Sequence, residues 1–100
     1  MAIDLFCYLA IDRSAAESGL GDVRSEYPEI FDKKFIISPV RDIDAALKEI
    51  ADEYGLKAES LFLVSLNDKN SADLIPLVSR ILAGKFEEAI LILQDNEYRR

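Results

Sequence analysis

Hydrophobic and polar positions along this chain form two kinds of segment, uncharged runs and amphipathic stripes. Residues 61–66, Leu-Phe-Leu-Val-Ser-Leu, carry no charge and lie between turn-forming residues, which is typical of a strand buried on both faces. Ile3–Ala10 is rich in aromatic and branched residues on both faces, so it predicts a second strand inside the sheet. Phe35–Ile37 and Ala89–Leu93 predict two further strands.

Two of these segments leave an alternative open. Ala89–Leu93 also fits a helix that begins near Phe86, but the nearby Gly84 and the adjacent branched residues favour a strand. Glu29–Phe31 is a short apolar patch, and it is a candidate hairpin arm for Phe35–Ile37.

The first helix is predicted between the first two strands. Ser14 and Glu17 have the spacing of a capping box, so the helix is expected to begin at Ser14 and to end before Pro28. Glycine lowers helix stability, so a shorter helix that ends at Gly19 is the alternative.

Two more helices follow from clear apolar stripes. The second helix is expected to begin at Ser38-Pro39 or at Asp42, and Gly55 has the position of its C-terminal cap. The third is expected to begin near Ala72 or Asp73 and to end at Gly84. The stripe of the second helix consists of Ile43, Ala46, Leu47, Ile50, Ala51 and Tyr54.

Strands that alternate with helices indicate crossover connections. The sequence therefore predicts a single α/β domain over residues 1–100, with a largely parallel or mixed sheet of about four strands covered by about three helices. A chain of 100 residues is near the commonest domain size.

The negative net charge of the chain favours some classes of binding partner over others. The chain has 19 acidic against 12 basic residues and a net charge of −7. A negative surface repels phosphate backbones and anionic lipids, and it attracts basic proteins. We therefore expect a basic protein partner, with no binding to nucleic acid or membrane. Solubility is the alternative explanation of the acidity.

The residues that most enzymes and metal sites need are missing. The chain has no histidine and one cysteine, Cys7, so neither a zinc site nor a Cys–His nucleophile pair can be built. Cys7 lies in an apolar strand and is expected in the core. We predict no catalytic residue, cofactor or metal, and the single cysteine with no signal peptide or membrane helix indicates a cytoplasmic protein.

Acidic residues concentrate in the stretch from Asp12 to Asp32 and in the second helix with its flank. If both segments cover the same side of the sheet, they form one negative field with a tyrosine beside it, which suits recognition of a basic protein. Two solvated helix faces are the alternative. The candidate partner-binding residues are Asp22, Glu26, Tyr27, Asp44, Glu49 and Asp52.

In its size, acidity and lack of catalytic groups, the chain is similar to the small immunity proteins that bacteria pair with nuclease toxins, such as those of colicin and contact-dependent inhibition systems. The resemblance covers the general character of the whole chain and not a motif. It implies inhibition in the cytoplasm by occlusion, in which acidic side chains take the place of the phosphates that a basic nuclease cleft expects.

Two other functions fit the same residues. In a parallel sheet, Arg13, Arg41 and Lys69 would follow strand ends and could together hold an anionic small molecule, as in a ligand-binding domain or enzyme. Alternatively, the apolar run near the C-terminus could lie at a sheet edge and pair with another chain of a larger assembly.

Overall fold

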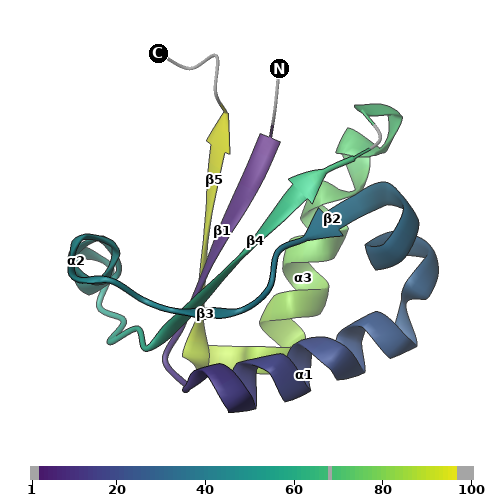
Figure 1. The fold of residues 1–100 in the computed structure, drawn as a ribbon. Helices are drawn as coiled ribbons and strands as arrows, with labels where there is room; N and C mark the ends of the chain where they lie inside the picture. Colours follow the sequence, from purple (N-terminus) through teal and green to yellow (C-terminus); the bar gives the residue numbers. More distant parts are fainter. Residues whose placement is uncertain (1–2, 68, 97–100) are drawn as a thin grey trace.

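The computed structural model describes residues 3–67 and 69–96. Their sheet has the strand order β2-β4-β1-β5, with β3 also paired to β4, and each pairing is antiparallel (Figure 1). The strands are β1 (Ile3–Leu9), β2 (Phe35–Ile37), β3 (Arg41–Asp42), β4 (Ser60–Leu66) and β5 (Ile90–Asn96). The helices are α1 (Arg13–Glu26), α2 (Ala45–Glu53) and α3 (Ile75–Phe86), with short helical turns at Ile30–Lys34, Lys69–Leu74 and Glu87–Ala89.

The prediction of a parallel or mixed sheet of about four strands is wrong, because the sheet has five strands and is antiparallel throughout. β1 and β2 run in the same direction, as their helical connection suggests, but β4 lies between them. β4 and β5 also run in the same direction, and β1 lies between them. In each case the two strands joined through a helix are separated in the sheet by a third strand that runs in the opposite direction. The order of elements in the sequence cannot show this insertion.

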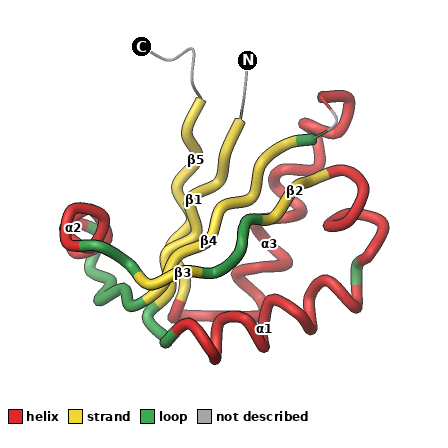
Figure 2. Tube along the Cα trace, in the orientation of Figure 1, coloured by secondary structure: helices red, strands yellow, loops and turns green. Residues whose placement is uncertain are grey.

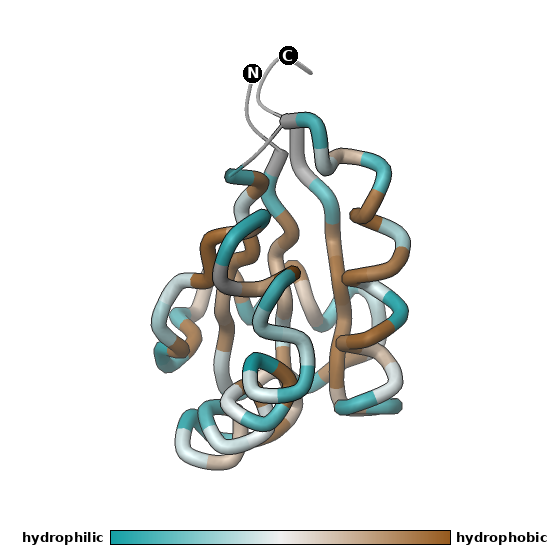
Figure 3. Tube along the Cα trace, turned by 90° about the vertical axis from the view of Figure 1, so that its right-hand side faces the viewer, coloured by the Kyte–Doolittle hydropathy of each residue, from teal (hydrophilic) through white to brown (hydrophobic). Residues whose placement is uncertain are grey.

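The uncharged runs of the inner strands are explained by helices on both faces of an antiparallel sheet, and not by parallel pairing. α1 and α3 pack on one face of the sheet and α2 packs on one end of the other, so β4 and β1 carry hydrophobic residues on both faces (Figure 2). The prediction that residues 61–66 and Ile3–Ala10 form inner strands is confirmed. The last predicted strand is also confirmed from Ile90 onward, while Ala89 ends a short helical turn. In Figure 3 the helices alternate between hydrophobic and hydrophilic colours, as expected when one side of each packs on the sheet.

Strand register divides the core into two clusters. Cys7 lies opposite Phe62 on β4 and Ile92 on β5, and these side chains belong to the cluster beneath α1 and α3. The next residue along β1, Tyr8, lies opposite Leu61 and belongs to the smaller cluster beneath α2. The larger cluster also holds the aromatic pair Phe62 and Phe86, whose ring centroids are 6.5 Å apart.

The N-terminal caps of α1 and α2 are aspartates that the sequence analysis did not predict as caps. Asp12 caps α1, because its Oδ1 accepts a hydrogen bond of 2.8 Å from the Ala15 N–H. Asp44 caps α2 in the same way, with 2.9 Å to the Leu47 N–H. The predicted starts at Ser14, Ser38 and Asp42 are therefore wrong.

Ser38 has a different structural role. Its backbone N–H donates to the Leu63 carbonyl, and its Oγ accepts from the Leu63 N–H, each at 2.9 Å. Ser38 thus extends the edge pairing of β4 between β2 and β3.

Two of the three helices, α1 and α2, end where the sequence predicts, and α3 does not. α1 is continuous up to Glu26, and Gly55 has the positive φ of 84° that ends α2, with the Leu56 N–H bonded to the Ala51 carbonyl. α3 instead continues through Gly84 to Phe86, and Glu87 takes a positive φ of 53°. The proposed hairpin arm Glu29–Phe31 is also wrong, because Ile30–Lys34 forms a π-helical turn.

Candidate partner-binding surface

The structure divides the six candidate acidic and aromatic residues between two layers of the molecule. One group lies on and just after α1, and the other lies on and just before α2, across the sheet (Figure 1). The condition for one shared negative field, that both segments cover the same side of the sheet, is not met. The first group is Asp22, Glu26 and Tyr27, and the second is Asp44, Glu49 and Asp52.

The acidic charge of the α1 group is balanced by nearby cations. The Asp22 carboxylate accepts from the Lys85 Nζ at 3.1 Å, and both side chains are exposed. Glu26 and Tyr27 line a hollow of about 460 Å³ between α1 and α3, with Arg80 and Lys85 in the same lining. Tyr27 is 39% exposed. An apolar groove with acids and bases on its rim has no strong preference for a basic partner.

The α2 group has two roles. Asp44 satisfies a backbone N–H at the start of the helix, so its carboxylate is part of the fold as well as of the surface. Asp52 and Lys48 line a hollow with Lys57 and Glu59, on the side of α2 that faces the connection to β4. Leu47 and Ala51 pack on the sheet. Helical periodicity therefore directs Glu49 into solvent and places Ile50 on the side of α2 opposite this hollow.

Beyond α2, this face of the sheet stays partly exposed. Tyr8 and Leu61 are at most 2% exposed, but Phe6, Leu63 and Leu93 in the next row are only half-buried. In Figures 1 and 2, α2 lies over one end of the strands, and no described helix lies over the other end of this face. Ile36 on β2 is 56% exposed there.

The three cations of the alternative anion site do not form one site. Arg13 follows β1 and Arg41 lies opposite Leu61, at the end of the sheet where β4 begins. Residue 69 follows the other end of β4, beyond Ser65 and its partner Asp4. Because β4 runs in the opposite direction to β1 and β2, its C-terminal end lies at the other end of the sheet. The three cations therefore do not share one cleft.

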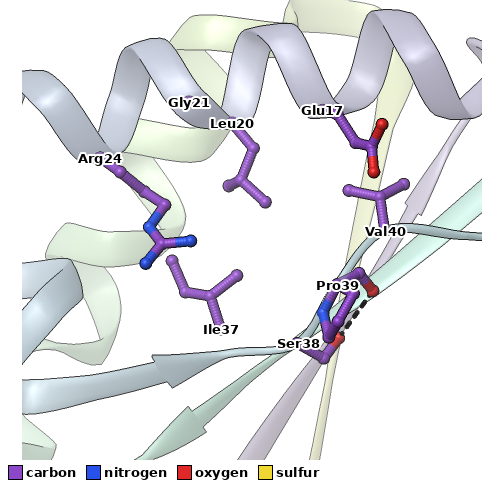
Figure 4. Close-up of a pocket in the computed structure, with 8 residues that line it drawn as sticks. All are labelled: Glu17, Leu20, Gly21, Arg24, Ile37, Ser38, Pro39 and Val40. Atoms are coloured by element: carbon purple, nitrogen blue, oxygen red, sulfur yellow. Dashed lines mark hydrogen bonds between the residues drawn. The ribbon is translucent and has the colours of Figure 1, made fainter.

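A small hollow of about 340 Å³ lies between α1 and the β2–β3 connection. In Figure 4 Arg24 and Glu17 lie toward its two sides, with Leu20 between them and Val40 beside Glu17. The Ser38 hydroxyl in its lining accepts from the Leu63 N–H and donates to the Pro39 carbonyl, so this hollow supplies neither an activated nucleophile nor a paired acid and base.

Other chemistry is limited in the described part of the chain. Burial raises the pKa of the Cys7 thiol, because the apolar core disfavours the thiolate, so this cysteine is unreactive as predicted. Residues 3–67 and 69–96 contain no group of three or more potential metal ligands. Within the same ranges, no helix is long and apolar enough to span a membrane.

Comparison with known proteins decides among these possibilities. A family model described as CDI System Immunity Component matches residues 1–98. The chain belongs to this family. It is 72% identical over 101 residues to Immunity protein CdiI-2 of Burkholderia pseudomallei strain 1026b, with 100% of both chains covered. It also matches a chain of the CdiA-CT/CdiI toxin and immunity complex from Burkholderia pseudomallei, with a TM-score of 0.90 and 71% identity over 96% of this chain and 94% of that one.

The resemblance to contact-dependent inhibition immunity proteins is thus confirmed. For a CDI immunity component, the surface of interest is the one that a toxin can cover. Sequence patterns did not find Phe6, Leu63 and Leu93, because hydrophobic residues in an inner strand are expected in a core. No sequence signal could have marked them, because helical periodicity does not tell which face of a sheet a helix covers.

Proposed function

We propose that this chain neutralises a CdiA-CT toxin by binding to it and occluding its active site. Membership of the CDI immunity family carries the proposal, because a relative that is 71% identical is part of a toxin and immunity complex. Inhibition of this kind is stoichiometric and needs no turnover, which suits a chain without a nucleophile paired to a base in its described part.

The toxin partner in this proposal is basic and cleaves nucleic acid. The net charge of −7 supports a basic partner, since opposite charges steer association and acidic groups replace nucleic-acid phosphates in a basic cleft. The α2 group, with Asp44, Glu49 and Asp52, contacts the toxin, because α2 lies beside the part of the sheet that stays partly exposed. The encounter takes place in the cytoplasm of the cell that is protected.

Co-expression tests this function directly. CdiA-CT of the Burkholderia pseudomallei complex is induced in cells with and without this chain, and growth is followed. The proposal predicts arrest with toxin alone and normal growth with both proteins. Growth arrest in the presence of the chain would contradict it.

A cleavage assay tests the mechanism. Purified CdiA-CT is incubated with total RNA and with plasmid DNA while the chain is titrated in. Occlusion predicts that cleavage ends at one chain per toxin, and that the affinity of the complex falls as salt is raised. Cleavage that continues in a fully formed complex would exclude occlusion of the active site.

A further inference from the structure

The two faces of the sheet differ in how far helices cover them. On the face beneath α1 and α3, three successive inward residues of β1, Leu5, Cys7 and Leu9, are at most 2% exposed. On the opposite face, burial of that kind is confined to the end beneath α2, at Tyr8 and Leu61. The remaining half of that face holds a hydrophobic row across β4, β1 and β5, and beyond it a row that is partly polar.

These side chains form one surface. Phe6 lies opposite Leu63 on one side and Leu93 on the other, so the three form a row across β4, β1 and β5. Ile36 lies opposite Ser65, one row farther from α2, and Ile50 on α2 is 37% exposed. We call Phe6, Ile36, Ile50, Leu63 and Leu93 the open-face patch.

The border of the patch is acidic. Asp4 shares its face, and its Oδ1 accepts a hydrogen bond of 2.7 Å from the Ser65 Oγ. Glu53 is exposed on the side of α2 that faces away from the hollow of Lys48 and Asp52, and Glu49 is exposed on the outer side of the helix. Arg41 lies on the same face but opposite Leu61, at the end that α2 covers.

An apolar centre with a charged border is the usual anatomy of a protein interface. We propose that the open-face patch is the centre of the toxin interface, and that it receives an apolar side chain that the toxin presents within a basic surface. This inference rests on the proposed function and names the surface that performs it. The acidic border steers the basic toxin, and the apolar centre supplies most of the affinity.

Charge selects the toxin over a second copy of the chain. In a twofold contact through the patch, each acidic border would face the same border of its partner, and both chains carry a net charge of −7. The hollow beside Tyr27 is a weaker candidate for a basic partner, because Arg80 and Lys85 contribute to its lining.

Ile36→Lys tests the patch by titration calorimetry with CdiA-CT of the Burkholderia pseudomallei complex. Ile36 is 56% exposed on a short edge strand, so lysine is tolerated by the fold but places a cation against a basic partner. Binding is expected to weaken by about 100-fold, as for the loss of an interface hot spot. Ala83→Lys on α3, also at an exposed position, is the matched control and is expected to bind within about twofold of the native chain.

The outcomes separate this inference from the proposed function. If the native chain neither binds nor neutralises CdiA-CT, the proposed function is contradicted. If the native chain neutralises the toxin and Ile36→Lys binds as tightly as the native chain, the function stands and the open-face patch is excluded.

Light scattering tests whether a second copy of the chain, and not the toxin, binds to the patch. The free chain is expected to be monomeric. A dimer that Ile36→Lys dissociates, with toxin affinity unchanged, would assign the patch to a second copy and overturn the inference. Thermal unfolding verifies that the variants are folded, and Ile50→Lys on α2 repeats the test if Ile36→Lys is not.

Discussion

Phe62 and Leu63 are neighbours on the central strand β4, yet they belong to different parts of the protein. Phe62 is fully buried beneath α1 and α3, and Leu63 is half-buried on the face that α2 covers at one end. In the sequence both are hydrophobic residues of the same uncharged run. The comparison teaches that an inner strand can carry core residues on one face and interface residues on the other, and that the number of helices per face decides which.

Truncation of these two neighbours should give the largest contrast. Phe62→Ala is expected to lower the free energy of unfolding by about 3–5 kcal/mol, because it leaves a cavity in the larger core cluster. Leu63→Ala is expected to cost only about 1–2 kcal/mol and to weaken CdiA-CT binding instead, since part of its surface is already exposed. Urea unfolding and calorimetry measure both quantities. Equal losses of stability would contradict the assignment of the two faces.

The sequence predicted the inner strands, the three helices and the buried cysteine, because these depend on local periodicity and hydrophobicity. It did not predict the antiparallel order, since β4 inserts between β1 and β2 through contacts that are distant along the chain. It also missed Asp12 and Asp44 as caps, since several polar residues near each helix start satisfy the same rule.

The candidate site was predicted in part. Asp44, Glu49 and Asp52 lie on or just before α2, which packs on the face that we assign to the toxin, and Asp22, Glu26 and Tyr27 lie on the other layer. The division could not be predicted, because helical periodicity tells which side of a helix is exposed but not which face of the sheet the helix covers. These residue assignments remain predictions that binding measurements must test.

Charge reversal compares the two layers by association rate. The pair Glu49→Lys and Asp52→Lys is expected to slow association with CdiA-CT by about 10-fold at low salt and to flatten its salt dependence, because steering charges are lost. The pair Glu26→Lys and Glu29→Lys changes the net charge equally on the other layer, and a change below about threefold is expected. Stopped-flow kinetics at several salt concentrations measures both. A larger effect of the second pair would move the interface to the α1 side.

Two glycines of α1 probe how tightly the covered face is packed. A Cβ at Gly19 would lie 2.7 Å from the Phe86 ring, whereas a Cβ at Gly21 would meet nothing within 4 Å. Gly19→Ala is therefore expected to destabilise the fold by about 1 kcal/mol. Gly21→Ala should stabilise it by about 0.5–1 kcal/mol, because alanine favours a helix. Thermal unfolding of both variants checks the contrast, and stabilisation by both would show that α1 and α3 are not closely packed.

The smallest effect concerns the tyrosine beneath α2. Burial raises the pKa of Tyr8, with smaller contributions from the nearby Tyr54 and Asp44. Because the unfolded phenol ionises near pH 10, more readily than the folded one, the contribution of Tyr8 to stability is complete below about pH 10 and is lost as the pH rises further.

Tyr8→Phe should therefore reduce the loss of stability above about pH 10, by less than about 1 kcal/mol. Urea unfolding between neutral and alkaline pH compares this variant with the native chain. An identical pH profile for Tyr8→Phe and the native chain would contradict the assigned burial of this phenol.

Methyl NMR of the isotope-labelled chain, titrated with unlabelled CdiA-CT, tests the central claim most directly. The account predicts that cross-saturation from the toxin reaches the methyl groups of Ile36, Ile50, Leu63 and Leu93, and leaves those of Leu77 and Ile81 in the α1–α3 hollow unaffected. Cross-saturation of Leu77 and Ile81 with silent open-face methyl groups would place the toxin on the covered side of the molecule and contradict the account.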